Sequence, residues 1–61
     1  MKAYVGEKRK IRRTVGGFKA GEIVEVLNIL GKNKHHDREL FVRNIDGKKG
    51  NILYKDTRKL K

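Results

Sequence analysis

The chain has 61 residues, and a domain of this length buries only about 60% of the surface that its unfolded chain exposes, so we expect one small domain over residues 1–61. It contains no cysteine, which excludes disulfides, thiolate-bound zinc and a cysteine nucleophile. Its 17 Lys and Arg residues against 7 Asp and Glu residues give a formal net charge of +10, and an anionic polymer relieves such an excess, so nucleic acid is the leading class of partner.

The N-terminal part of the chain predicts a first strand at residues 2–5 and then a long basic loop at residues 6–17. The first residues turn polar before any apolar run forms, so we expect no signal peptide, no membrane partner and a cytoplasmic location. Five of the six residues from 8 to 13 are cations. We interpret this cluster as the main contact with the partner, and its alternative is a solvated loop with Ile11 against the core.

Residues 22–30 form the clearest predicted strand, because β-branched and other apolar residues dominate them. Val24 and Val26 would point to one side, and Ile23, Leu27 and Ile29 to the other. We therefore expect both faces of this strand to be covered, as in the middle of a tightly curled barrel.

A polar loop at residues 31–38 separates this strand from another at residues 39–45. Asp46-Gly47 then predicts a tight hairpin turn with positive φ at both residues, followed by a strand at residues 49–54. Gly50 inside that strand predicts a bulge or a close approach of two backbones. The tail is expected to hold one helical turn and a short closing strand, with Leu60 as its only anchor.

The four aromatic residues are Tyr4, Phe18, Phe41 and Tyr54. A small barrel needs most of its aromatic residues for packing, so we assign Phe18 and Phe41 to the core. Tyr4 and Tyr54 are candidates for stacking on an unpaired base.

No constellation of side chains in the sequence points to catalysis. His35, His36 and Asp37 suggest a metal site, but adjacent histidines usually point apart, so we interpret them as part of a polar loop that holds no metal. The chain has no serine and no pair of acids suited to acid–base chemistry. We predict no enzyme, no catalytic residue, no cofactor and no small-molecule substrate.

Three segments carry a family resemblance. In residues 17–27 an aromatic residue, two further residues and a Gly-Glu pair precede an alternating apolar run, and in residues 46–53 two glycines three apart lead into an apolar pair. Together with Ala3-Tyr4-Val5, they resemble the diverging turn, the distal hairpin and the Ala-Leu-Tyr opening of SH3 domains. The resemblance implies an all-β fold, a five-stranded SH3-like barrel with a long basic first loop and a short helical turn before the last strand.

The peptide-binding part of the SH3 pattern is missing. The chain has no tryptophan and no proline, and the loop that is acidic in eukaryotic SH3 domains is basic here. The sequence is therefore more similar to prokaryotic and phage SH3-like barrels, including KOW and Tudor-like modules, several of which bind nucleic acid while others bind proteins.

We predict a monomeric, noncatalytic module that binds DNA or RNA through backbone charge. One alternative is a protein-interaction module, such as a small phage or host regulatory factor, that docks on an acidic surface of a larger enzyme. Others are a protein that is basic only for solubility and a barrel whose edge strand pairs with itself in an oligomer. The predicted binding residues come from two loops and two tyrosines: Lys8, Arg9, Lys10, Arg12, Arg13, Lys32, Lys34, Tyr4 and Tyr54.

Overall fold

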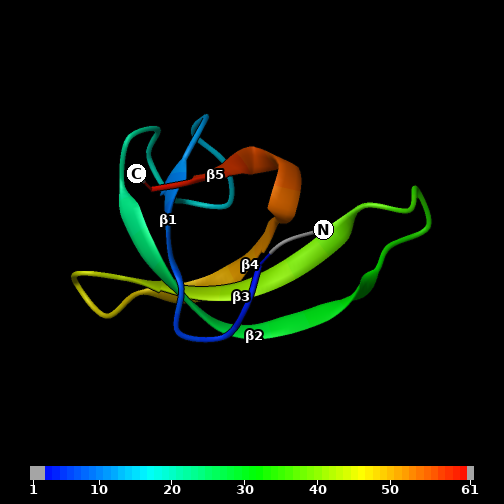
Figure 1. Cartoon of the computed structure of the whole chain (residues 1–61). Coiled ribbons are helices and arrows are strands. Elements are labelled where there is room, and N and C mark those ends of the chain that lie inside the picture. Colours follow the sequence, from blue (N-terminus) through cyan, green and yellow to red (C-terminus); the bar gives the residue numbers. More distant parts are fainter. Residues whose placement is uncertain (1–2, 61) are drawn as a thin grey trace.

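Short β-branched runs, separated by glycines and polar turns, form one antiparallel sheet in the computed structural model, which describes residues 3–60 (Figure 1). The strand order is β4-β3-β2-β1-β5, and a 3-10 turn, η1, precedes the last strand. The predicted all-β fold with five strands and a late helical turn is confirmed. The elements are β1 (Lys8–Ile11), β2 (Ile23–Lys32), β3 (Arg38–Asn44), β4 (Lys49–Leu53), η1 (Tyr54–Asp56) and β5 (Thr57–Lys59).

The first strand lies later in the chain than the sequence predicted. β1 occupies part of the segment expected to be a basic loop, where Ile11 is buried and pairs with Thr57 of β5. The strand expected at residues 2–5 is wrong for its described part, because residues 3–7 are coil and turn; Lys2 lies outside the described residues. This turn is joined to β2 by the Gly6 N–H, which donates to the Val26 carbonyl at 2.8 Å.

A β-bulge explains why β2 has apolar residues at both odd and even positions. Val26 pairs with Val42, but the next pair is Asn28 with Phe41, so Leu27 is an extra residue. Val24 and Val26 are buried before the bulge, and Ile29 packs against the same core after it. The strand therefore has one apolar face, which is formed by even-numbered residues before the bulge and by odd-numbered residues after it. The cover expected over the other face is absent at Ile23, which is 40% exposed.

The core is one cluster of residues from β1, the loop after it, β2, β3 and β4. Phe18 belongs to it, as predicted, and a two-way backbone pair with Val15 at 2.9 Å holds it in the loop after β1. The core assignment of Phe41 is wrong: it is only half-buried, because alternation along β3 turns it to the face opposite Leu40 and Val42. The buried core residues are Ile11, Phe18, Val24, Val26, Leu40, Val42 and Ile52.

The tail is anchored more firmly than Leu60 alone would allow. Thr57 is buried beside Ile11, and its hydroxyl donates to the Tyr54 carbonyl at 2.8 Å. Asp56, at the end of η1, is also buried. Within residues 3–60 the structure has no helix that is long and apolar enough to cross a membrane.

The bulge or close approach of two backbones predicted at Gly50 is wrong, because β3 and β4 pair here without a register shift and the close neighbour of Gly50 is a side chain. A Cβ atom at this position would lie 3.2 Å from Cε2 of the Phe18 ring. Gly50 pairs with Val42 on the core side of the sheet, so the missing side chain leaves the room that the ring occupies.

We expect Gly50→Ala to lower the free energy of unfolding by about 1–3 kcal/mol, because the buried Phe18 ring must shift to admit the methyl group. Urea denaturation of the variant measures this loss. Gly31→Ala is the matched control, because Gly31 lies in β2 with open space where its Cβ would be. A Gly50→Ala protein as stable as the control would show that the ring does not need this space.

The β3–β4 turn comprises residues 45–48 and is capped by Asn44. Its Oδ1 accepts the backbone N–H groups of Asp46 at 3.0 Å and Lys48 at 2.9 Å, and its carbonyl accepts the Gly47 N–H at 3.0 Å. Gly47 has φ 85°, whereas Asp46 does not have positive φ. The hairpin is confirmed, but the expected turn with positive φ at both residues is wrong.

The β2–β3 turn repeats this hydrogen-bond pattern without a glycine. Asn33 Oδ1 accepts the N–H groups of His35 at 2.8 Å and Asp37 at 3.0 Å, and the Asn33 carbonyl accepts the His36 N–H at 2.9 Å. His36 therefore occupies the position of Gly47, with φ 64°. A histidine in this left-handed region is strained relative to glycine.

Replacing His36 with glycine is expected to raise the free energy of unfolding by about 0.5–1 kcal/mol, because relief of the left-handed strain exceeds the entropy cost of glycine. Asn33→Ala is expected to lower it by about 1 kcal/mol, because two backbone N–H groups lose their acceptor. Thermal unfolding of both variants checks these signs. A destabilised His36→Gly protein would mean that the imidazole makes a contact that matters more than the strain.

Candidate nucleic-acid interface

Alternation along β1 separates the cations of the basic segment. Arg9 and Ile11 point to the core side, where both are buried, and Lys8 and Lys10 point to the opposite side of the sheet. We call this opposite side the outer face. Lys8 is exposed and Lys10 is half-buried. The basic segment therefore divides its cations between the two sides of the sheet, with Arg9 buried on the core side and Lys8 and Lys10 on the outer face.

Arg9 is enclosed by three side chains and is only 3% exposed. Its Nε donates to Thr57 Oγ1 at 2.7 Å, its Nη1 lies 3.4 Å from Glu7 Oε2, and its guanidinium carbon lies 4.5 Å from the centroid of the Tyr54 ring. This guanidinium does not present its charge at the surface, so we remove Arg9 from the candidate contacts. Half-buried Tyr54 has Arg9 over its ring, which leaves it less free to stack on a base.

Removing the Arg9 side chain is expected to destabilise the domain by about 3–5 kcal/mol, because Glu7 would keep a buried charge without its partner. Arg9→Lys should cost less, since the charge remains. Lys10→Ala is the matched control on the same strand, where we expect a change within about 0.5 kcal/mol. Guanidinium denaturation measures all three, and an Arg9→Ala variant as stable as Lys10→Ala would contradict the structural role.

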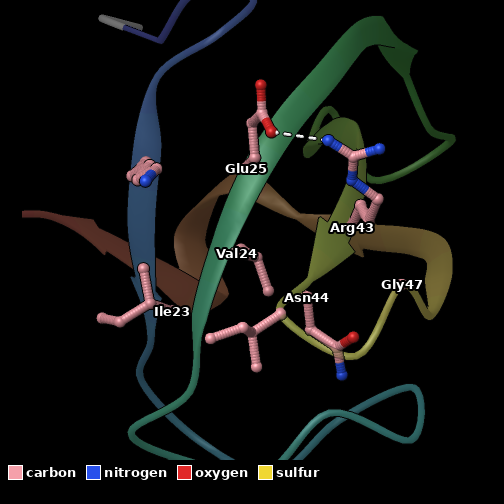
Figure 2. Close-up of a pocket in the computed structure, with 8 residues that line it drawn as sticks. Ile23, Val24, Glu25, Arg43, Asn44 and Gly47 are labelled. Carbon is pink, nitrogen blue, oxygen red and sulfur yellow. Dashed lines mark hydrogen bonds and ion pairs between the residues drawn. The ribbon is translucent and has the colours of Figure 1, made fainter.

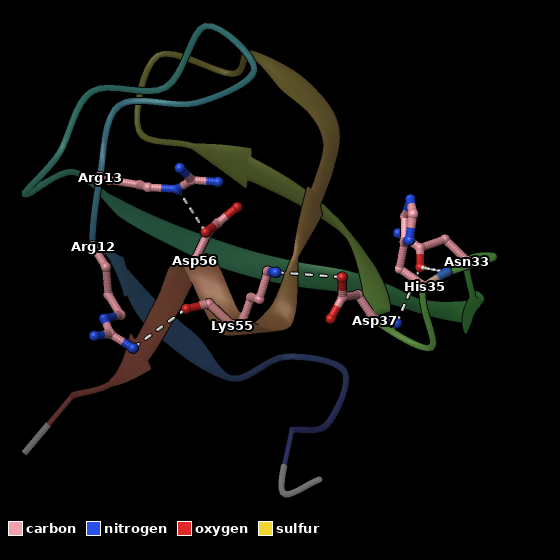
Figure 3. Close-up of polar contacts among 7 residues, drawn as sticks. All are labelled: Arg12, Arg13, Asn33, His35, Asp37, Lys55 and Asp56. Carbon is pink, nitrogen blue, oxygen red and sulfur yellow. Dashed lines mark hydrogen bonds and ion pairs between the residues drawn. The ribbon is translucent and has the colours of Figure 1, made fainter.

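Arg12 and Arg13 follow β1 and contact η1 (Figure 3). Arg13 Nε donates to Asp56 Oδ1 at 2.8 Å, so the exposed arginine compensates a buried carboxylate. Asp56 Oδ2 is buried and accepts no hydrogen bond within the described residues. Arg12 Nη1 donates to the Lys55 carbonyl at 3.4 Å, which leaves its charge uncompensated by that contact. Arg12 is therefore the better candidate contact of the two.

Lys32 and Lys34 lie at the tip of the β2–β3 hairpin and are exposed. Figure 1 shows this tip at the far right of the molecule, whereas β1 and β5 lie at the left. Between them, Asp37 pairs with Lys55 at 3.3 Å (Figure 3). The structure therefore does not join these lysines with the β1 cations in one patch.

The remaining sequence candidates are the exposed Tyr4 and the histidine loop. Tyr4 is 60% exposed in the turn before β1, so its ring is open to a partner. His35 and His36 belong to the capped turn at the hairpin tip. In the part of the chain from residue 3 to residue 60, no group of three His, Asp or Glu side chains is placed to hold a metal ion.

Cations from four strands meet on the outer face instead. Strand register places Lys10 between Arg58 of β5 and Ile23 of β2. A second row runs from Lys8 of β1 through Glu25 of β2 and Arg43 of β3 to Lys49 of β4. We call the five cations of these two rows the outer basic face: Lys8, Lys10, Arg43, Lys49 and Arg58.

Glu25 is the acid within these rows, and it is already paired. Its Oε1 lies 2.9 Å from Arg43 Nη2. Figure 2 marks this ion pair with a dashed line. The charges of Lys8, Lys10, Lys49 and Arg58 take part in no ion pair within residues 3–60. The face therefore keeps a positive field toward solvent.

Two hollows open on this face. The larger, of about 390 Å³, lies over β2 and β3 and includes the apolar residue Ile23 (Figure 2). It also includes Ile45, which is 95% exposed. The smaller, of about 250 Å³, is lined by Lys10, Ile11, Arg12, Gly21 and Arg58. Sequence reasoning did not group Arg58, Arg43 and Lys49 with the β1 cations, because only the pairing register shows that they share a face with β1.

Comparison with known proteins does not extend this description. No model of a protein family, no curated protein and no solved structure matches the chain. The role of the outer basic face is therefore inferred from its own chemistry.

Proposed function

We propose that this protein is a noncatalytic, SH3-like barrel that binds nucleic acid through the phosphate backbone, with the outer basic face as its contact surface. The observation that carries the proposal is the gathering of five cations from four strands on one face, with a single acid in their rows that is already paired. A field of this kind lowers the free energy of binding to a polyanion.

The order of the elements supports the SH3-like part of the proposal. Two consecutive hairpins join β2, β3 and β4, η1 precedes the last strand, and β5 returns to pair with β1. This is the order that the sequence resemblance implies. Phe18 in the loop after β1 and Gly50 in β4, just after the turn of the second hairpin, also lie where that resemblance places them. The two residues pack together.

The spacing of the cations suits a chain of phosphates. Neighbouring strands lie about 4.8 Å apart, and alternate residues of one strand about 6.7 Å apart, so flexible Lys and Arg side chains cover a strip of backbone. Arginine forks can hold two phosphate oxygens at once. Contacts of this kind position a nucleic acid without reading its sequence, so the proposed binding has little sequence specificity.

A protein partner with an acidic surface is the second candidate, and one observation favours it. Ile23 and Ile45 are exposed beside Lys8 and Arg43 in the larger hollow, and exposed apolar residues rimmed by charge are common in protein interfaces. The cations favour both partners, whereas the apolar pair favours a protein.

Titration with duplex DNA, single-stranded DNA and RNA at two salt concentrations separates these candidates, with an acidic protein as the control. If the protein neutralises three phosphates of duplex DNA, its affinity falls about 40-fold between about 50 mM and 200 mM salt. We expect at least one nucleic acid to bind with a salt dependence of this order, and the acidic protein to bind more weakly. No binding to nucleic acid at the lower salt, or an affinity that salt does not change, would overturn the proposal.

Two double variants with equal charge test which face binds. Lys8→Ala with Lys49→Ala removes two cations from the outer basic face and should lower the salt slope by about two. Lys32→Ala with Lys34→Ala removes the same charge from the hairpin tip and should change it less. Equal slopes for the two variants would reject the outer face as the contact surface.

A further inference from the structure

The smaller hollow of the outer face is distinguished by three cations: Lys10 of β1, Arg58 of β5 and Arg12, which follows β1. Lys10 and Arg58 lie directly opposite each other in the β1–β5 ladder, and Arg12 lies two residues beyond Lys10. Gly21 and Ile11 complete the lining. Each of the three cations borders the same space of about 250 Å³.

No acid lines this hollow, and Glu22 and Asp56, which lie close in the sequence to its lining residues Gly21 and Arg58, are bonded to other groups. Glu22 follows Gly21, but its carboxylate accepts the Lys19 N–H at 2.6 Å and the Asn44 side-chain amide at 3.0 Å. These hydrogen bonds, the backbone one foremost, lower the pKa of Glu22. Asp56 is buried and bound to Arg13. The hollow is therefore cationic without an internal counterion.

Backbone hydrogen bonds fix the two other lining residues, Ile11 and Gly21. The Gly21 N–H donates to the Ile11 carbonyl at 2.8 Å, and the Ile11 N–H donates to the Glu22 carbonyl at 2.8 Å. These two bonds hold the turn at residues 19–22 against the end of β1. Because both N–H groups are already used, an anion in this hollow must be held by the three side chains.

We infer that this hollow is a phosphate-binding subsite that holds one phosphate group of the nucleic acid. The inference rests on the proposed function for the source of that phosphate. The guanidinium forks of Arg12 and Arg58 suit paired oxygens, and the Lys10 ammonium supplies a third charge. The group can be an internal phosphodiester or a terminal phosphomonoester, whose charge of about −1.5 to −2 at pH 7 is the closer match to three cations.

The first test titrates the folded protein with inorganic phosphate and follows its 1H–15N spectrum, with sodium chloride at equal ionic strength as the reference. We expect saturable shifts centred on Lys10, Arg12, Gly21 and Arg58. Arg58→Gln should abolish them, whereas Lys34→Gln at the hairpin tip should keep them. Shifts no larger than those with chloride, or spread equally over the hairpin tip, would overturn the subsite.

The second test uses one oligonucleotide with a 5′-phosphate, with a 3′-phosphate and with neither. Arg58→Gln is expected to weaken binding roughly tenfold or more, and the Lys34→Gln control only a few-fold. Tighter binding of a phosphorylated end identifies the terminal group as the source, and equal affinities for the three forms identify an internal phosphate. Lys10→Gln is a second variant of the hollow, and a dispersed spectrum shows that each variant is folded.

The two proposals fail in different ways. If nucleic acid binds with the expected salt dependence but Arg58→Gln and Lys10→Gln lose no more affinity than Lys34→Gln, the subsite is rejected and the proposed function stands. If no nucleic acid binds at low salt, the proposed function is rejected, whatever inorganic phosphate does.

Discussion

Strand β1 imposes the constraint on which the rest of the structure depends. It lies between β2 and β5, so every second side chain must enter the core, and the chain supplies an arginine at one of those positions. A buried charge is costly unless it is paired and hydrogen-bonded. Glu7, Thr57 and the Tyr54 ring meet this need at Arg9, and they tie the turn before β1, η1 and the start of β5 to the centre of the sheet. The same alternation leaves Lys8 and Lys10 on the outer face.

The β1 cations are divided between the core side and the outer face, and the acidic residues form their ion pairs mostly away from the outer face. The chain has seven acidic residues, and four of them form ion pairs within residues 3–60. Glu7 compensates the buried Arg9, the buried Asp56 is compensated by the exposed Arg13, and Asp37 ties the β2–β3 loop to η1. Few acids are left to lower the field of the outer face. Folding therefore concentrates the excess charge, and this concentration is what we propose to be functional.

The sequence predicts the elements whose signals are local and misses those that depend on pairing. The strands near residues 22–30, 39–45 and 49–54, the Asp46-Gly47 hairpin and the burial of Phe18 follow from short apolar runs and turn residues. β1 was missed because cations fill its alternating pattern, and the bulge at Leu27 because no local residue marks it. Arg58 joins Lys10 only through a pairing between strands almost fifty residues apart, which no local pattern contains.

Lysine footprinting shows directly whether the outer basic face is the contact surface, because it reports the reactivity of each lysine in the protein without any substitution. The folded domain would be acetylated briefly, with and without single-stranded or duplex nucleic acid at low salt, and the reaction at each lysine read by mass spectrometry. If the outer basic face binds the nucleic acid, Lys8, Lys10 and Lys49 will be protected, and Lys32 and Lys34 will be as reactive as in the free protein. Protection that is uniform over all lysines, or strongest at the hairpin tip, would contradict it.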